Sequence, residues 1–169
     1  MATEPPIKLD DLDKDILTEL QNDATVSYKD LSKKIGAAES TVYDRTRRLR
    51  QVGIIKGIVP LLDAKKCGKL TTAWIRISIE SIKDIGRISK ELSMIDELLE
   101  VHEISGEWDI LVKTKVTDNE ELRNLEVEKI GPIKGIKGLY SLIAVRTEKE
   151  DIRLKLESLE EQMAKNSIH

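Results

Sequence analysis

The spacing of apolar residues changes once along the chain, and this change limits the folds open to it. Up to about residue 52 the apolar residues recur every three or four positions, which is typical of amphipathic helices. From residue 71 onward, segments of alternating apolar and polar residues are interleaved with two further helical patterns. The 169 residues suffice for one ordinary domain or two small ones. We expect two, of different architecture.

The first part contains three short helical patterns. One covers about residues 9–21, and Asp10, Asp11 and Asp13 at its start are suited to capping unpaired N–H groups. The next runs from Ser27, a candidate cap, to Gly36, which tolerates positive φ. A third follows from Glu39 to Gly53, with an apolar face of Val42, Thr46 and Leu49. A tight glycine turn between the last two helices predicts a helix-turn-helix, with its third helix in the DNA major groove.

Basic charge is concentrated in the same region. The chain has a formal net charge of −3, yet residues 29–56 carry eight basic and three acidic residues, a net +5. Local field decides where a polyanion binds, so we expect double-stranded DNA to contact this window. The residues that we expect at the DNA are Lys29, Lys33, Ser40, Thr41, Tyr43, Asp44, Arg45, Arg47, Arg48 and Gln51.

Arginine suits such an interface because its planar fork matches phosphate oxygens and guanine edges. Four arginines stand within positions 45–50. The alternative is a solvated helix face on which Asp44 and Arg48 form an i,i+4 ion pair. The turn, the spacing and the charge window together favour DNA binding.

The second part predicts the element order β-α-β-β-α-β. Its strands are expected at 71–80, 98–104, 108–116 and 136–146, and its helices at 82–95 and 118–130. This order is the ferredoxin-like arrangement, with helices on one face of an antiparallel sheet, and gives the chain an α+β class. The uncovered face carries Trp74 or its neighbours, and we expect another subunit to cover it.

We therefore divide the chain into a winged-type helix-turn-helix domain (1–60), a linker (61–70), a ferredoxin-like domain (71–148) and a helical tail (149–169). A short strand is expected at 54–60, where β-branched residues precede Pro60. The tail helix is predicted from a single apolar stripe of Ile152, Leu156, Leu159 and Met163. The stripe does not indicate whether this helix packs on its own domain or on a neighbouring subunit.

Several function classes are not favoured by the sequence. No apolar run approaches a membrane span, and the first residues lack a secretory pattern. Cys67 is the single cysteine, which excludes an internal disulfide and favours a reducing cytoplasm, with the protein on the nucleoid when bound to DNA. His102 and His169 supply no metal cluster, and neither a catalytic triad nor a phosphate loop can be assembled. We expect no metal, no cofactor and no enzyme.

The segment LDDLDKDILTELQNDATVSYKDLSKKIG, with STVYDRTRRLRQVGIIKGI after it, resembles the leucine-responsive regulatory protein/asparagine regulator (Lrp/AsnC) family of transcription regulators. The second half is similar to the ligand-sensing module of that family, including its Gly-x-aromatic-Asp turn. The resemblance extends over about residues 9–147. It implies dimers formed through the sensing sheets, often in rings of dimers, with a small effector such as an amino acid bound between dimers.

Carried over to this sequence, the resemblance implies an effector site at the turn and on the last strand, formed by Gly106, Glu107, Trp108, Asp109, Leu139, Tyr140 and Ser141. The glycine turn could offer N–H groups to a carboxylate, and Glu107 or Asp109 could face an ammonium group. The alternative is a plain hairpin turn with Trp108 in the core. Ala38 stands where the family often has a serine cap. A second reading of the whole chain is a sequence-tolerant, chromatin-like DNA-organising protein that responds to no effector.

Overall fold

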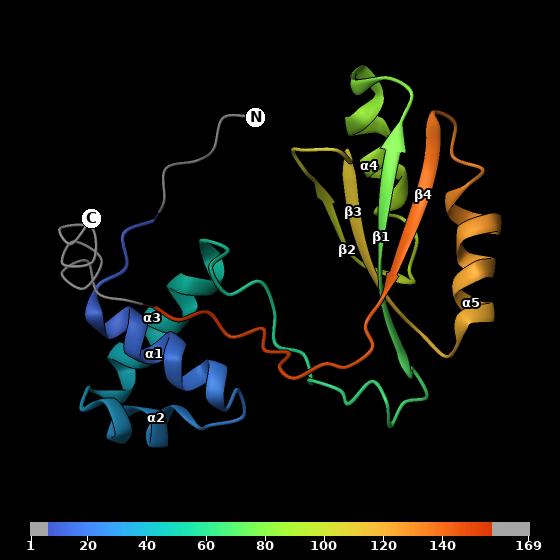
Figure 1. The fold of residues 1–169 in the computed structure, drawn as a ribbon. Coiled ribbons are helices and arrows are strands. Elements are labelled where there is room, and N and C mark those ends of the chain that lie inside the picture. Colours follow the sequence, from blue (N-terminus) through green and yellow to red (C-terminus); the bar gives the residue numbers. More distant parts are fainter. Residues whose placement is uncertain (1–6, 157–169) are drawn as a thin grey trace, which may run out of the picture. The chain divides into compact units, whose positions relative to one another are not determined.

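The computed structural model describes residues 7–156, which form two compact units (Figure 1). One unit comprises residues up to Pro60 together with the segment that begins at Asp151, and the other comprises Leu61–Glu150. The chain thus leaves the first unit once, forms the second, and returns to the first.

The first unit is a three-helix domain of α1 (Asp11–Asn22), α2 (Tyr28–Ile35) and α3 (Glu39–Gln51). The backbone N–H of Asp30 donates to the Ser27 side chain at 3.1 Å, and Gly36 ends α2 in the left-handed conformation with φ 69°. Both helix signals predicted from the sequence are therefore confirmed. The buried core of this unit consists of Ile16, Leu17, Leu31, Val42 and Leu49.

The strand that we expected at residues 54–60 is not formed, so that prediction is wrong. Gly53, with φ 75°, ends α3, and the N–H groups of Ile54 and Ile55 donate to the Leu49 carbonyl at 3.0 and 3.1 Å. Their side chains pack against the core of the first unit. These β-branched residues close a helix, and no strand in the described part of the chain pairs with the segment that follows.

The second unit is a four-stranded antiparallel sheet with helices, as the element order predicted. Its strands are β1 (Thr71–Ile79), β2 (Leu98–Glu103), β3 (Ile110–Val116) and β4 (Ile136–Ile143), in the spatial order β2-β3-β1-β4. A short 3-10 turn, η1 (Ile82–Asp84), precedes α4 (Ile85–Leu92), and α5 (Asn119–Asn124) continues into a π-helical segment, η2 (Leu125–Ile130). Because β3 begins at Ile110, the expected strand start at residue 108 is wrong by two residues.

Both helices of this unit pack on one face of the sheet. In the register, Ile75 faces Val112 and Ile77 faces Ile110, and all four side chains are buried. Ile88 of α4 and Leu122 of α5 belong to the same cluster. The opposite face lacks a helix in the described part of the chain and carries half-buried side chains such as Trp74 and Arg76.

The tail helix is not present at residues 151–156, so this part of the prediction is wrong. The backbone of Leu154 bonds to the side chain of Gln21 on α1, and Leu156 packs against the core of the first unit. These side-chain bonds occupy backbone groups that a helix would pair internally. Leu159 and Met163 lie outside the described residues.

Candidate functional site

The four arginines of α3 fall into two pairs with different environments. Arg47 and Arg50 are exposed, whereas Arg45 and Arg48 are half-buried. Each pair is spaced by three residues, so its members lie on one side of the helix. The pairs point in different directions because neighbouring positions of a helix differ by about 100°.

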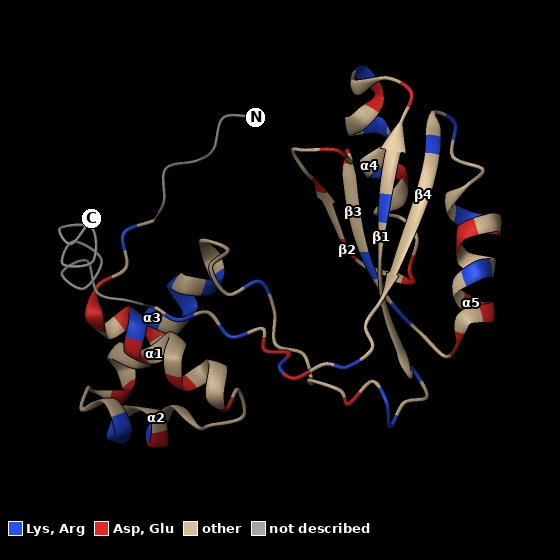
Figure 2. Cartoon of the chain, viewed as in Figure 1, with Lys and Arg blue, Asp and Glu red and all other residues tan. Residues whose placement is uncertain are grey.

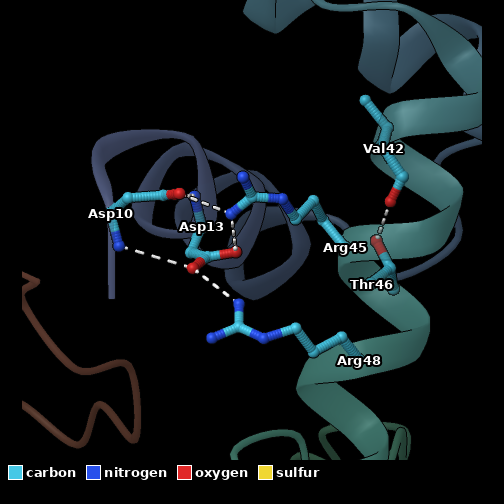
Figure 3. A network of polar contacts seen from close by, with 6 residues as sticks. All are labelled: Asp10, Asp13, Val42, Arg45, Thr46 and Arg48. Carbon is cyan, nitrogen blue, oxygen red and sulfur yellow. Dashed lines mark hydrogen bonds and ion pairs between the residues drawn. The ribbon is translucent and has the colours of Figure 1, made fainter. Parts of the chain in front are cut away.

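Arg45 and Arg48 bind the start of α1 (Figure 3). Arg45 Nη1 lies 3.2 Å from Asp13 Oδ1 and also pairs with Asp10, while Arg48 Nη1 lies 3.0 Å from Asp13 Oδ2. Arg48 therefore pairs with a residue of another helix rather than with Asp44, the partner that the alternative reading proposed. Sequence reasoning missed these contacts, although the matching three-residue spacing of Asp10–Asp13 and Arg45–Arg48 was a usable signal.

The two aspartates also form the capping box of α1. Asp10 Oδ1 accepts a hydrogen bond from the Asp13 N–H at 2.9 Å, and Asp13 Oδ2 accepts one from the Asp10 N–H at 3.3 Å. This confirms the capping role expected for them. The bond from the Asp13 N–H, together with the Arg45 guanidinium, lowers the pKa of Asp10. Both carboxylates thus serve the helix start and the arginines at once.

The exposed side of α3 carries most of the residues that we expected at DNA. Tyr43 is 48% exposed, and its ring packs edge-on against Tyr28 with centroids 5.3 Å apart, so its direction is fixed. Figure 2 shows basic residues on both α2 and α3. The exposed members of the expected set are Lys29, Lys33, Ser40, Thr41, Tyr43, Asp44, Arg47 and Gln51.

Other polar side chains of the first unit form their hydrogen bonds and ion pairs away from the exposed side of α3. Thr46 is fully buried, and its hydroxyl donates to the Val42 carbonyl at 2.8 Å (Figure 3). Lys34 joins α2 to α1 through Glu19 at 2.9 Å. Ala38 is the N-cap of α3 and makes no side-chain cap bond, so the start of this helix lacks the capping contact that a serine would supply.

The turn expected to bind an effector is anchored to the end of β1. Gly106 has φ 135°, a conformation that residues with a side chain rarely adopt. Asp109 Oδ2 accepts from the Ile79 N–H at 2.9 Å, and the Asp109 N–H donates to the Ile77 carbonyl at 3.1 Å. One carboxylate oxygen of Asp109 is therefore engaged by the backbone, whereas Glu107 is exposed.

The structure brings together only part of the expected effector set. The rings of Trp108 and Tyr140 lie 5.9 Å apart, and the Arg76 guanidinium lies 5.7 Å from the Tyr140 ring centroid. In the register, Arg76 faces Tyr140 across β1 and β4. These three side chains form an aromatic and cationic cluster on the open sheet face, which we call the Tyr140 cluster.

Leu139 and Ser141 lie on the other face of the same strand. They face the buried Ile77 and Ile75 in the register, and Leu139 packs against the core. The Ser141 hydroxyl donates to the Glu126 side chain in the π-helical segment η2. Alternation along β4 therefore separates Tyr140 from its two neighbours, a separation that the family resemblance did not reveal.

Within residues 7–156, no helix has both the length and the apolar character needed to cross a membrane. The same range contains no group of three or more His, Cys, Asp or Glu residues arranged to hold a metal ion.

Two family models match the sequence. The AsnC-type helix-turn-helix domain matches residues 9–50, and the Lrp/AsnC ligand binding domain matches residues 72–154. Among characterised relatives, the HTH-type transcriptional regulator FL11 of Pyrococcus horikoshii is 34% identical over 150 residues, which cover 89% of this chain and 98% of FL11.

Solved structures show the same fold. Escherichia coli AsnC superposes with a TM-score of 0.81 at 26% identity, covering 87% of this chain and 99% of AsnC. A transcriptional regulator of Neisseria meningitidis, solved in complex with L-Met, also has a TM-score of 0.81. It is 23% identical and covers 88% of this chain and 97% of its own, so this likeness is one of fold alone.

Proposed function

The chain belongs to the Lrp/AsnC family of helix-turn-helix transcriptional regulators, and from this premise we propose that it binds a two-fold DNA operator sequence-specifically and that a small effector changes this binding. It is a regulator and not an enzyme, and its ligand-binding domain implies an effector. Operator specificity, effector class and assembly are the proposed parts.

The observation that carries the proposal is the exposed face of α3. Arg47 and Gln51 lie four residues apart on this face, and Ser40 lies near the start of the helix. Arginine can bind guanine with two hydrogen bonds, and glutamine can do the same with adenine. The side chains therefore have the donors and acceptors that base discrimination needs. Arg50, Lys29 and Lys33 supply exposed positive charge for the flanking phosphates.

A dimer is the smallest assembly that fits a two-fold operator. Two recognition helices must lie about 34 Å apart to enter successive major grooves. The open sheet face supports dimer formation because it combines half-buried Trp74 with Tyr140, which is 51% exposed. We propose this face as the dimer contact, with rings of dimers as the higher assembly.

An amino acid is the effector class that we propose. The L-Met complex of the Neisseria regulator supports it, and so does the turn at Gly106, whose exposed backbone is available to a carboxylate. Glu107 is exposed and suits an ammonium group. The Tyr140 cluster offers aromatic surface close to Trp108 in the same turn.

The direct test compares Arg47→Ala with the wild-type protein on a DNA fragment that contains the promoter of its own gene. Loss of one base-contacting arginine should weaken binding by about 1–3 kcal/mol, or roughly five- to 150-fold, with the loss confined to one base position. Lys137→Ala, an exposed charge change in the second unit, is the control. Equal DNA affinity of Arg47→Ala and wild type would contradict the assignment of α3 to the DNA interface.

A further inference from the structure

The acidic residues at the start of α1 form ion pairs with two of the four arginines of α3. Asp13 accepts hydrogen bonds from both Arg45 and Arg48, and Asp10 pairs with Arg45 (Figure 3). Two carboxylates and two guanidinium groups thus form a closed group with no net charge, which we call the Asp13 network.

Burial makes this pairing strong at its centre. The Asp13 side chain is 1% exposed, whereas those of Arg45 and Arg48 are 34% and 42% exposed. An ionised carboxylate removed from water is strongly unfavourable unless it is paired and hydrogen-bonded. Asp13 has two guanidinium partners and the Asp10 N–H as donors. If both arginines moved away from Asp13, its carboxylate would have to become exposed to water or remain buried without a charged partner.

We propose that Asp13 determines which arginines of α3 are available to DNA, and that it thereby limits sequence-independent phosphate binding. The proposal rests on the DNA-binding function proposed above. Arg45 and Arg48 are held against α1 as positioning groups, whereas Arg47 and Arg50 are free to contact DNA. The acidic pair thus divides a cluster that looks uniform in the sequence.

This division has a measurable electrostatic consequence. Each phosphate neutralised by a basic side chain releases counterions, so the logarithm of the binding constant falls with the logarithm of salt concentration by about 0.9 per contact. Arginines that remain on Asp13 add nothing to this slope. Withholding them lowers affinity for DNA of any sequence and leaves binding more dependent on base contacts.

The first experiment uses the full chain and a mixed-sequence duplex, titrated between about 50 and 200 mM salt. Arg50→Ala, which removes an exposed charge assigned to the flanking phosphates, should make the slope shallower by about 0.9, whereas Arg48→Ala should leave it unchanged within error. Arg48→Ala keeps Asp13 paired with Arg45, so the domain remains folded, which a circular-dichroism melt checks. Equal slope changes for the two variants would overturn the proposal.

The second experiment releases the arginines instead of removing them. Asp13→Asn keeps the shape of the side chain but lacks its charge, and should steepen the slope by about 0.9 to 1.8 while raising affinity for the mixed-sequence duplex. Asp15→Asn, an equal charge change at an exposed position of the same helix, should leave the slope unchanged. Adding Arg48→Ala to Asp13→Asn should reverse about 0.9 of the increase.

The outcomes separate the two proposals. If Arg50→Ala has no effect on slope or affinity, the DNA-binding face of α3 is wrong. If Arg50→Ala flattens the slope as expected but Arg48→Ala flattens it equally, only the role of Asp13 is wrong. The same conclusion follows if Asp13→Asn and Asp15→Asn give the same slope. Should Asp13→Asn fail to fold, the comparison of Arg50→Ala with Arg48→Ala decides the question alone.

Discussion

The side-chain amide of Gln21 forms two hydrogen bonds with the backbone of Leu154, a residue 133 positions further along the chain. The Leu154 N–H donates to Gln21 Oε1 at 2.6 Å, and Gln21 Nε2 donates to the Leu154 carbonyl at 3.0 Å. Beside it, Arg153 donates to the Asn22 side chain at 3.0 Å. The segment after β4 is thereby fixed to α1, so the chain connects the first and second units twice.

Removing the Gln21 side-chain amide should free the segment around Leu154 from α1. In Gln21→Ala, the Leu154 amide should exchange with solvent about two- to tenfold faster, because a hydrogen bond contributes about 0.5–1.5 kcal/mol. Hydrogen exchange followed by NMR measures this rate. Thr18→Ala, an exposed change on the same helix, is the control and should leave it unaltered. An unchanged rate in Gln21→Ala would show that other contacts hold the segment.

The unfilled cap of α3 predicts an easy gain in stability. Ala38→Ser places a hydroxyl where the first N–H groups of α3 lack a side-chain acceptor, and should raise the free energy of unfolding by about 1 kcal/mol. Chemical denaturation measures the change. Ala24→Ser, at an exposed position in the turn between α1 and α2, should have no such effect. A gain no larger than that of Ala24→Ser would contradict the capping account.

Glu121 makes the stability of the second unit depend on pH. Lys69 Nζ lies 2.6 Å from Glu121 Oε1, and this bond, with the Thr117 N–H, lowers the pKa of Glu121 to about 2. Because the pKa is lower in the folded state, the resulting stability is present above the ordinary value of 4.5 and is lost as pH falls toward 2.

The corresponding variant is Glu121→Gln. It should unfold more readily at neutral pH and lose less stability than wild type between pH 4.5 and 2, as measured by thermal melts across that range. Glu120→Gln, exposed on the same helix, serves as control. Parallel pH curves for Glu121→Gln and wild type would contradict the assignment.

We expect the turn at Gly106 to contribute to effector binding and not to DNA binding. Gly106 has φ 135° with open space around it, so Gly106→Ala meets no clash and acts only through backbone strain of about 1–3 kcal/mol. We expect the variant to bind DNA as tightly as the wild type. We expect it to lose most of any effect that an amino acid has on that DNA affinity. Calorimetric titration of the twenty amino acids into each protein measures effector binding, and DNA titration with and without the amino acid measures its effect on DNA affinity. Gly86→Ala serves as the control. Effector binding equal to wild type would exclude the turn.

Local periodicity was sufficient to predict most of the fold. The alternation around Ile75 and Ile77 placed β1 and its buried face, and Ser27 and Gly36 marked the ends of α2. Both signals act within a few residues, where the side-chain pattern determines the element. They correctly gave three helices followed by a sheet.

Features that depend on distant partners were not predictable in this way. The β-branched residues from Ile54 onward resemble a strand, but no strand in the described part of the chain pairs with them, and Ile54 and Ile55 bond to the last turn of α3 instead. The residues from Ile152 resemble a helix, but Leu154 is held by Gln21. The division of the arginine cluster depends on Asp13, more than thirty positions earlier. The last two cases were decided by contacts between segments far apart in sequence, and the first by the absence of a strand partner in the described part of the chain.

Sequence-specific binding is the central claim, and the ratio of two affinities tests it most directly. Footprinting across the promoter of the protein's own gene locates an operator, and its dissociation constant is then compared with that of a mixed-sequence duplex at the same salt concentration. The account predicts a protected two-fold site bound about 10³-fold or more tightly than the mixed sequence. Uniform protection, with a ratio near one, would contradict it and identify a sequence-tolerant DNA-organising protein.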